Sequence, residues 1–144
     1  MKQSLRKSLN YFGLPIIQLE VMGKMHLFIA DTGSNVNLVS SELKDEFANC
    51  HASVGKFSTL GVGGDSENEM YELQYSIDGM AFSDLFGTLD GTFKVLEEEY
   101  GIRISGLVGT EFMVRHHVII DFSDGIIYMS GAPDEVRSGM KQRA

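Results

Sequence analysis

Two-residue turn signals between runs of apolar residues constrain the fold of this chain more than any other feature of its sequence. Asp78-Gly79 and Asp124-Gly125 are dipeptides typical of tight β-hairpin turns, and Met22-Gly23-Lys24 joins two further strand-like runs. The chain has 16 glycines and 2 prolines among its 144 residues, which favours short strands connected by tight turns. We therefore expect a single domain that is mostly β.

The expected elements follow from apolar periodicity and from capping residues. Strands are expected at Ile16–Val21, Met25–Ala30, Val36–Val39, Phe57–Leu60, Met70–Ile77, Met80–Thr88, Leu107–Gly109, Val118–Phe122 and Ile126–Met129. Short helices are expected from a Ser40 or Ser41 cap through Leu43 and Phe47, over Leu89–Tyr100 up to Gly101, and over Phe112–His116 with Thr110 as the cap. We interpret residues 1–13 as an N-terminal extension, 14–130 as the domain and 131–144 as a flexible polar tail.

Composition argues against several classes of function. The formal net charge of −8 disfavours nucleic acid and anionic membranes as partners, because no basic stripe is available to neutralise phosphates. Cys50 is the only cysteine, so neither an intrachain disulfide nor a thiolate metal cluster is expected. No apolar run of secretory or membrane-spanning length follows Met1–Lys7, which makes a cytoplasmic location the default expectation.

Two groups of potential metal ligands have simpler interpretations. His116 and His117 lack a second cluster at ligand spacing, so we expect surface or helix-end histidines and no metal site. The run Glu97-Glu98-Glu99 is expected to be the solvated face of the helix over Leu89–Tyr100.

The segment with the clearest chemical meaning is Phe28-Ile29-Ala30-Asp31-Thr32-Gly33-Ser34. A carboxylate directly follows an apolar strand, in a tight loop whose glycine lets a neighbouring backbone or ligand approach closely. Burying such a charge costs several kcal/mol unless hydrogen bonds or a partner offset it. The tripeptide Asp-Thr-Gly also occurs in ordinary strand-ending turns, so an incidental turn in a small β-rich protein is one alternative.

A second segment, Ser105-Gly106-Leu107-Val108-Gly109-Thr110-Glu111-Phe112-Met113, begins about 75 positions further on. With both segments in place, the chain resembles the retropepsin-like aspartic proteases, the single-lobe relatives of pepsin, and in particular their bacterial members. Their pattern is a hydrophobic-Asp-Thr/Ser-Gly loop, a glycine-bearing flap hairpin, and a hydrophobic-hydrophobic-Gly strand before a helix. The flap candidate is Thr59-Leu60-Gly61-Val62-Gly63-Gly64-Asp65, and the resemblance covers about residues 14 to 130.

The resemblance implies a closed or partly open β-barrel of the acid-protease type with one or two short helices. It implies an aspartic-type endopeptidase that uses no metal or cofactor and acts on peptide or protein substrates. The implied catalytic residues are Asp31, Thr32 and Gly33, the implied substrate-binding residues are Ser34, Gly61, Val62, Gly63 and Gly64, and the implied structural motif is Leu107, Val108 and Gly109. A phosphate-cradling function for the glycines at 61–64 is disfavoured, because the segment has no P-loop lysine.

Only one Asp-Thr/Ser-Gly motif is present in the chain. Because the chemistry needs two carboxylates, we expect a homodimer in which each copy supplies one Asp31. Ser34–Asn37 and Gly109–Glu111 stand where the retroviral enzymes carry acidic residues and an arginine, so the resemblance does not extend to their intersubunit ion pairs. The alternative function is a catalytically inactive peptide-binding or dimerisation module on the same fold.

Overall fold

The computed structural model describes residues 1–48, 53–59, 66–89 and 91–130 of the chain. In chain order its elements are β1 (Lys2–Ser4), α1 (Arg6–Phe12), β2 (Ile16–Val21), β3 (Lys24–Ala30), β4 (Asn37–Val39), α2 (Ser41–Ala48), β5 (Ser53–Thr59), β6 (Ser66–Ile77), β7 (Met80–Thr88), α3 (Thr92–Tyr100), β8 (Gly106–Val108), α4 (Thr110–Arg115), β9 (Ile119–Asp121) and β10 (Ile126–Tyr128). These described residues include four short helices, where the fold class implied one or two, and the first of them lies in segment 1–13.

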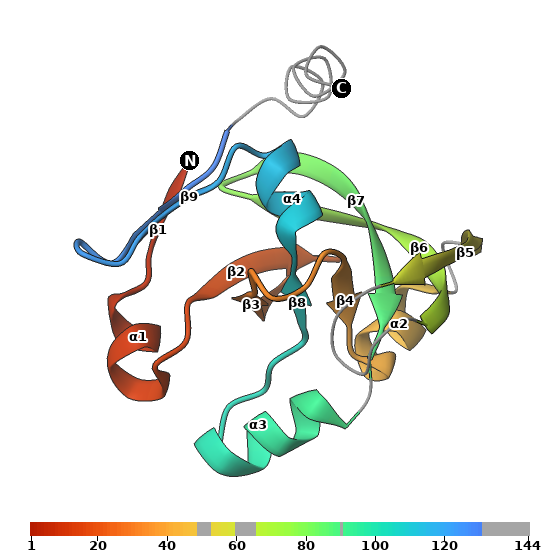
Figure 1. Ribbon diagram of the computed structural model, residues 1–144, viewed down its shortest axis with the longest axis horizontal. Helices are drawn as coiled ribbons and strands as arrows, with labels where there is room; N and C mark the ends of the chain where they lie inside the picture. Colours follow the sequence, from red (N-terminus) through yellow and green to blue (C-terminus); the bar gives the residue numbers. More distant parts are fainter. Residues whose placement is uncertain (49–52, 60–65, 90, 131–144) are drawn as a thin grey trace.

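Six of the described strands close into a ring (Figure 1). Their order is β2-β3-β8-β4-β7-β6, and β6 returns to β2 through the pair Glu20↔Ser76. β8 pairs parallel with β3 and antiparallel with β4, while β4 pairs parallel with β7. β5 pairs with the first part of β6. The fold is therefore the mostly β barrel that the resemblance implied.

The hairpin turns confirm the turn signals in the sequence. Met22 and Gly23 between β2 and β3 have φ values of 50° and 79°, and Asp78 and Gly79 between β6 and β7 have 51° and 79°. Two successive residues with positive φ match the right-handed twist of the paired strands. The turn before β10 is longer, and the Asp124 N–H donates to Asp121 Oδ1 at 3.0 Å.

The apolar side chains form two clusters, one on each face of the strands that carry the Asp31 loop. The interior cluster fills the barrel and includes Leu5, Ile17, Leu19, Phe28, Ala30, Val39, Leu73, Phe86, Val108, Phe112 and Ile127. The second, which we call the outer cluster, consists of the buried residues Ile16, Val36, Leu38, Met70, Phe93, Ile104 and Leu107. Half-buried residues of α1, β3, α3 and the connections between elements pack against the outer cluster.

The N-terminal segment packs closely against the rest of the chain. β1 pairs with β10, and β10 pairs with β9, giving a small three-stranded sheet. Leu5 is fully buried in the interior cluster, and its N–H donates to the carbonyl of Gly125. Residues 1–13 thus contribute a strand, a helix and one core residue. Residues 131–144 lie outside the described part of the chain.

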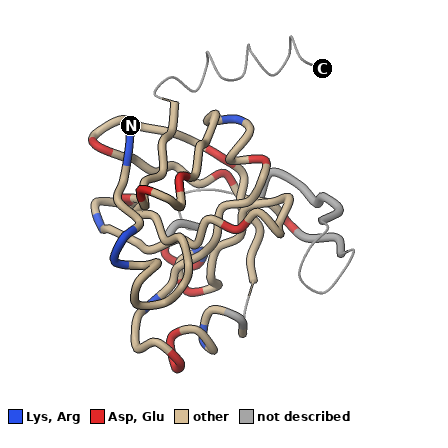
Figure 2. The backbone as a smooth tube through the Cα atoms, turned by 60° about the vertical axis from the view of Figure 1, so that its left-hand side comes forward, with Lys and Arg blue, Asp and Glu red and all other residues tan. Residues whose placement is uncertain are grey.

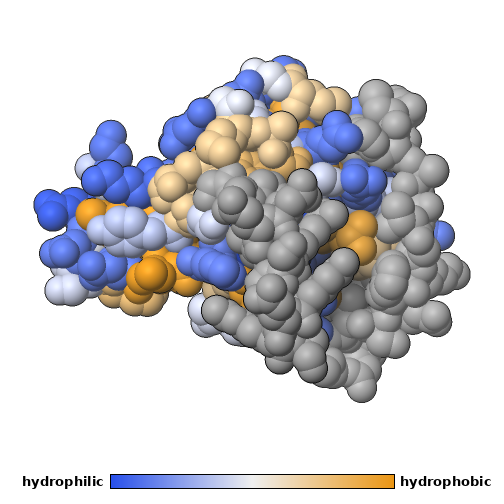
Figure 3. All heavy atoms as spheres, turned by 90° about the horizontal axis from the view of Figure 1, so that it is seen from above, coloured by the Kyte–Doolittle hydropathy of each residue, from blue (hydrophilic) through white to orange (hydrophobic). Residues whose placement is uncertain are grey.

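One face of the small sheet is exposed. Ile119 and Tyr128 are paired across β9 and β10 and are 62% and 38% exposed, and Phe122 in the following turn is 62% exposed. Figure 3 views the side of the molecule that carries β9 and α4, where apolar and hydrophilic residues are interspersed. The opposite face of this sheet joins the core through Ile127.

The helix ends differ in part from the expected ones. Ser40 Oγ accepts the Leu43 N–H at 3.2 Å at the start of α2, and Gly101 ends α3 in the left-handed conformation, as expected. Thr110 is the first residue of α4, and Gly109 occupies the cap position without a side-chain hydrogen bond, so the expected Thr110 cap was wrong. Acidic residues are spread over several elements (Figure 2), and Glu98 and Glu99 of α3 are exposed, as expected for a solvated helix face.

Candidate functional site

Asp31 lies at the point where β3 ends against β8. Ala30 pairs with Val108 in the parallel β3–β8 ladder, and the Asp31 N–H donates to the carbonyl of Val108 at 2.9 Å. Because β8 also pairs with β4, it lies between the two strands that flank the Asp31 loop. The two sequence motifs, Asp31-Thr32-Gly33 and Leu107-Val108-Gly109, are thus brought together in space.

The carboxylate of Asp31 is held by the backbone of its own loop. Asp31 Oδ1 accepts the N–H of Gly33 at 2.8 Å, and the Asp31 carbonyl accepts the N–H of Ser34 at 3.3 Å. Asp31 is half-buried, whereas Thr32 and Gly33 are exposed. The carboxylate is therefore fixed in position and lies at the edge of the molecular surface, where another molecule can reach it.

Ser34 has a structural position in this loop. It is 3% exposed, and its Oγ donates to the Val36 carbonyl at 2.7 Å. Its own carbonyl accepts the N–H of Thr110, the first residue of α4, at 2.8 Å. The substrate contact expected for Ser34 therefore has no exposed hydroxyl to make it, and the residue instead joins the Asp31 loop to α4.

Gly106 in β8 and Gly109 directly after it allow the Asp31 loop and β4 to pack closely against this strand. A Cβ built on Gly109 would lie 2.4 Å from the Val36 carbonyl oxygen and 2.6 Å from that of Ser34. A Cβ on Gly106 would lie 2.3 Å from the carbonyl oxygen of Leu38. These neighbours are backbone atoms, which cannot move aside as a flexible side chain can. The glycine of the Leu107-Val108-Gly109 motif is thus required by contact with the Asp31 loop.

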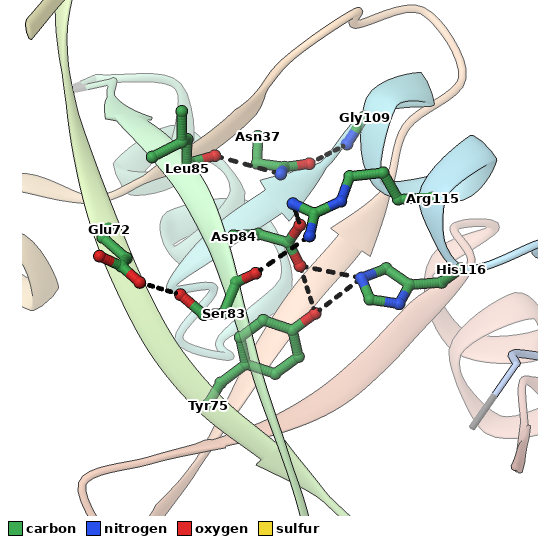
Figure 4. Close-up of polar contacts among 9 residues, drawn as sticks. All are labelled: Asn37, Glu72, Tyr75, Ser83, Asp84, Leu85, Gly109, Arg115 and His116. Carbon is green, nitrogen blue, oxygen red and sulfur yellow. Dashed lines mark hydrogen bonds and ion pairs between the residues drawn. The ribbon is translucent and has the colours of Figure 1, made fainter. Parts of the chain in front are cut away.

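Asn37 connects three parts of the barrel beneath the loop (Figure 4). Its side chain is buried, with Oδ1 accepting the Gly109 N–H at 2.9 Å and Nδ2 donating to the Leu85 carbonyl at 3.2 Å. Both partners are backbone groups, so the Asn37 side chain links the backbones of β7 and the β8–α4 connection. The sequence did not single out Asn37 as a positioning residue, because nothing local distinguishes it from a surface asparagine.

A second polar group, which we call the Asp84 network, lies next to Asn37 in Figure 4. The Asp84 side chain is 1% exposed and pairs with Arg115 and with His116 Nε2, the latter at 2.9 Å. Tyr75 OH donates to Asp84 Oδ2 at 2.6 Å. Burial and the neighbouring Asp84 carboxylate raise the pKa of Tyr75 far above its ordinary value. The network joins the end of α4 to β6 and β7.

His116 lies at the end of α4, which is one of the two positions expected for it, and it is 2% exposed. His117 is exposed. Within the described ranges there is no group of three or more His, Cys, Asp or Glu side chains that could hold a metal ion.

The strands on either side of the candidate flap in the sequence, β5 and β6, are antiparallel, and Thr59 pairs with Ser66. Gly61, Val62, Gly63 and Gly64 lie outside the described residues.

An apolar row crosses the strands at the level of Ile29, two residues before Asp31. Ile16 pairs with Ile29, Ile29 with Leu107, and Leu107 with Leu38, so one residue from each of β2, β3, β8 and β4 belongs to the row. Its members lie in or against the outer cluster. A cavity of about 540 Å³ adjoins one end of the row and is lined in part by Phe12, Ile16 and Leu27.

In the described part of the chain, none of the helices has the length and apolar character needed to span a membrane.

Comparisons with known proteins identify the fold. The structure is similar to a retropepsin-like aspartic protease from Rickettsia conorii, with a TM-score of 0.55, 15% sequence identity, and coverage of 88% of this chain and 86% of that chain. It is also similar to the retroviral protease-like domain of Ddi1 from Leishmania major, with a TM-score of 0.55, 11% identity, and coverage of 83% and 90%. No protein-family model and no curated protein sequence matches the chain. At these identities the likeness shows a retropepsin-like fold.

Proposed function

We propose that this chain, which has a retropepsin-like fold, is an aspartic-type endopeptidase that acts as a homodimer with one Asp31 from each copy in the catalytic dyad. The observation that carries this proposal is the position of Asp31. Its backbone is fixed by Val108, its carboxylate is oriented by the Gly33 N–H, and it is half-buried beside the exposed Thr32 and Gly33.

The dimer follows from the number of suitable carboxylates. Asp31 is the only aspartate of the chain in an Asp-Thr/Ser-Gly sequence. Asp78 lies in the β6–β7 turn and Asp124 in the β9–β10 turn, and neither has the corresponding loop. A second Asp31 therefore has to come from another copy. The exposed Thr32 and Gly33 leave room beside the carboxylate for the loop of that copy.

The proposed chemistry uses the two carboxylates in different protonation states. Two carboxylates a few ångströms apart do not both ionise, so the pair shares one proton. The ionised Asp31 takes a proton from a bound water, whose oxygen attacks the carbonyl carbon of the peptide bond. The protonated Asp31 of the other copy donates a hydrogen bond to the carbonyl oxygen, and a proton then passes to the leaving amine. No metal or cofactor takes part in this sequence.

The hairpin of β5 and β6 fits the proposal as a cover for the substrate. An extended peptide bound near Asp31 would be enclosed by the segment 60–65, with Val62 among its glycines. We assign Gly61, Val62, Gly63 and Gly64 to this lid as part of the proposal.

The test combines activity with solution mass. Purified full-length protein is incubated with a denatured protein substrate at mildly acidic pH, with and without a statine-type inhibitor, and products are identified by mass spectrometry. We expect inhibitor-sensitive cleavage by a dimer, a fall of about 100- to 10,000-fold in Asp31→Asn, and unchanged cleavage in Asp124→Asn, which alters an exposed turn carboxylate in the same way. Equal cleavage by Asp31→Asn would refute the proposal. A folded, inactive monomer at micromolar concentration would instead favour a non-catalytic module.

A further inference from the structure

Helix α3 is an insertion between β7 and β8 that lies outside the barrel strands. In Figure 1 it lies below them, along the chain that leads up into β8. Phe93 is 3% exposed and belongs to the outer cluster, and half-buried Leu96 packs against this cluster. Val95 on another side of the helix is 60% exposed. The apolar face of α3 is therefore directed toward the outer face of the strands.

The same face of the strands carries the proposed catalytic carboxylate. Successive side chains of a strand alternate between its two faces. Phe28 and Ala30 belong to the interior cluster, whereas Ile29 packs against the outer cluster. This alternation places Asp31, two residues after Ile29, on the outer face. Phe93 thus packs in the same cluster as Ile29, which lies two residues before Asp31 on this face.

The packing of α3 is constrained at one end and leaves space at the other. Tyr100 meets Phe12 of α1 edge-on, with ring centroids 5.2 Å apart. Near the start of α3, a cavity of about 290 Å³ lies between this helix and the start of α2, and Phe93 and Ile104 contribute to its lining. Phe93 therefore lies between this cavity and the rest of the outer cluster.

We propose that α3 forms a specificity-determining wall of the substrate site, with Phe93 limiting the size of the apolar side chain accepted next to the scissile bond. The inference rests on the proposed peptidase function. An extended peptide directs alternate side chains to opposite sides, so a side chain beside the Asp31 dyad points toward the apolar row. With Phe93 in place, small aliphatic side chains fit this position and aromatic ones are excluded. Shortening Phe93 joins the row to the neighbouring cavity and admits larger side chains.

The test compares cleavage-site preferences in a peptide library that varies only the residues flanking the scissile bond. Phe93→Leu is the main variant, since it keeps an apolar side chain in the cluster, and Leu96→Ala is the second. For both we expect kcat/KM for aromatic side chains, relative to alanine or valine, to rise at least about tenfold over the unmodified protein. Val95→Ala, on the exposed side of the same helix, is the matched control and should keep the original preference.

The outcomes separate this inference from the peptidase proposal. Cleavage by all variants with unchanged preference would overturn the role of α3 and leave the peptidase function intact. A uniform rise in kcat/KM for every side chain would also overturn it, because α3 would then be a general obstacle with no selectivity. Absence of cleavage by the unmodified protein and every variant would overturn the proposed function, and this inference with it. Thermal unfolding of each variant verifies that the fold is retained.

Discussion

Asn37 and Gly109, 72 positions apart in the sequence, are joined by a buried hydrogen bond of 2.9 Å from the Gly109 N–H to Asn37 Oδ1. This bond ties the strand that follows the Asp31 loop to the turn between β8 and α4. A second bond from Asn37 Nδ2 reaches the Leu85 carbonyl in β7. The geometry of the candidate catalytic loop thus depends on a neutral side chain that lies beneath it.

We expect Asn37→Ala to destabilise the fold. The substitution leaves the buried Gly109 N–H without its hydrogen bond, which costs about 1–3 kcal/mol, and also removes the partly buried bond to the Leu85 carbonyl. The measurement is urea unfolding, with Gln74→Ala on the exposed side of β6 as the control. If the proposed function holds, Asn37→Ala also lowers kcat at temperatures where it remains folded. A stability equal to that of Gln74→Ala would contradict this role of Asn37.

The variant Gly109→Ala tests whether the fold requires close packing of the Asp31 loop against Gly109. In Gly109→Ala the new Cβ would meet the Val36 and Ser34 carbonyl oxygens, at 2.4 and 2.6 Å, so we expect a loss of about 3 kcal/mol or more, or failure to fold. Gly101→Ala is an informative comparison, because φ there is +70° and the added Cβ meets no atom of the described residues within 4 Å. Its cost, about 1 kcal/mol, is that of the left-handed conformation alone. Equal unfolding free energies for the two variants would contradict the steric explanation.

The Asp84 network predicts a large effect from removing one buried charge. Asp84→Ala leaves Arg115 without its carboxylate and leaves Tyr75 and His116 without their shared acceptor, and breaking such a buried pair typically costs about 3–5 kcal/mol. Asp84→Asn, which keeps a hydrogen-bond acceptor, should cost less. Glu72→Gln on the exposed side of the neighbouring strand is the control, and we expect it to change the unfolding free energy little. An Asp84→Ala variant as stable as the control would contradict the inferred role of the network.

The sequence predicted the local features of the fold well, because they depend on neighbouring residues. The turns at Met22-Gly23 and Asp78-Gly79 need positive φ at both central residues, and the sequence placed glycine, with a preceding Met or Asp, at these positions. The resemblance picked out the Asp31 and Gly109 segments as motifs, and the β3–β8 ladder shows that they are in contact. The Thr110 cap was wrong because the extended Gly109 already occupies the cap position, which makes Thr110 the first helical residue.

The long-range polar contacts were not predictable from local pattern. Asp84 lies in a strand with alternating burial, and its partners Arg115 and His116 are 31 and 32 positions away. A polar residue in a strand normally indicates the solvent face, so a buried charge is not visible without its partners. The structure of residues 1–13 was missed for a related reason. Leu5 is a lone apolar residue among polar neighbours, and it is the fold of the distant β9–β10 hairpin that buries it.

His26 predicts a loss of stability on acidification. Its ring is partly buried, with Nδ1 bonded to Ser105 Oγ at 2.8 Å and Nε2 buried without a hydrogen-bond partner among the described residues. Burial, opposed in part by Glu46, lowers the pKa of His26 below its ordinary value of 6.5. At pH values well above 6.5 the ring is neutral in both the folded and the unfolded chain. As the pH falls below this value, the unfolded chain takes up the proton first, so the contribution of neutral His26 to stability is progressively lost.

The variant His26→Leu cannot bind this proton. We therefore expect the unfolding free energy of the unmodified protein, measured relative to that of His26→Leu, to fall as the pH is lowered from about 7.5 to about 5. The measurement is urea unfolding at a series of pH values, together with titration of the His26 ring by NMR. A relative stability that rises on acidification, or a ring that titrates above 6.5, would contradict the desolvated position of this side chain. The proposed peptidase is assayed at mildly acidic pH. The same unfolding measurements therefore define the pH range in which the variants are folded and their activities can be compared.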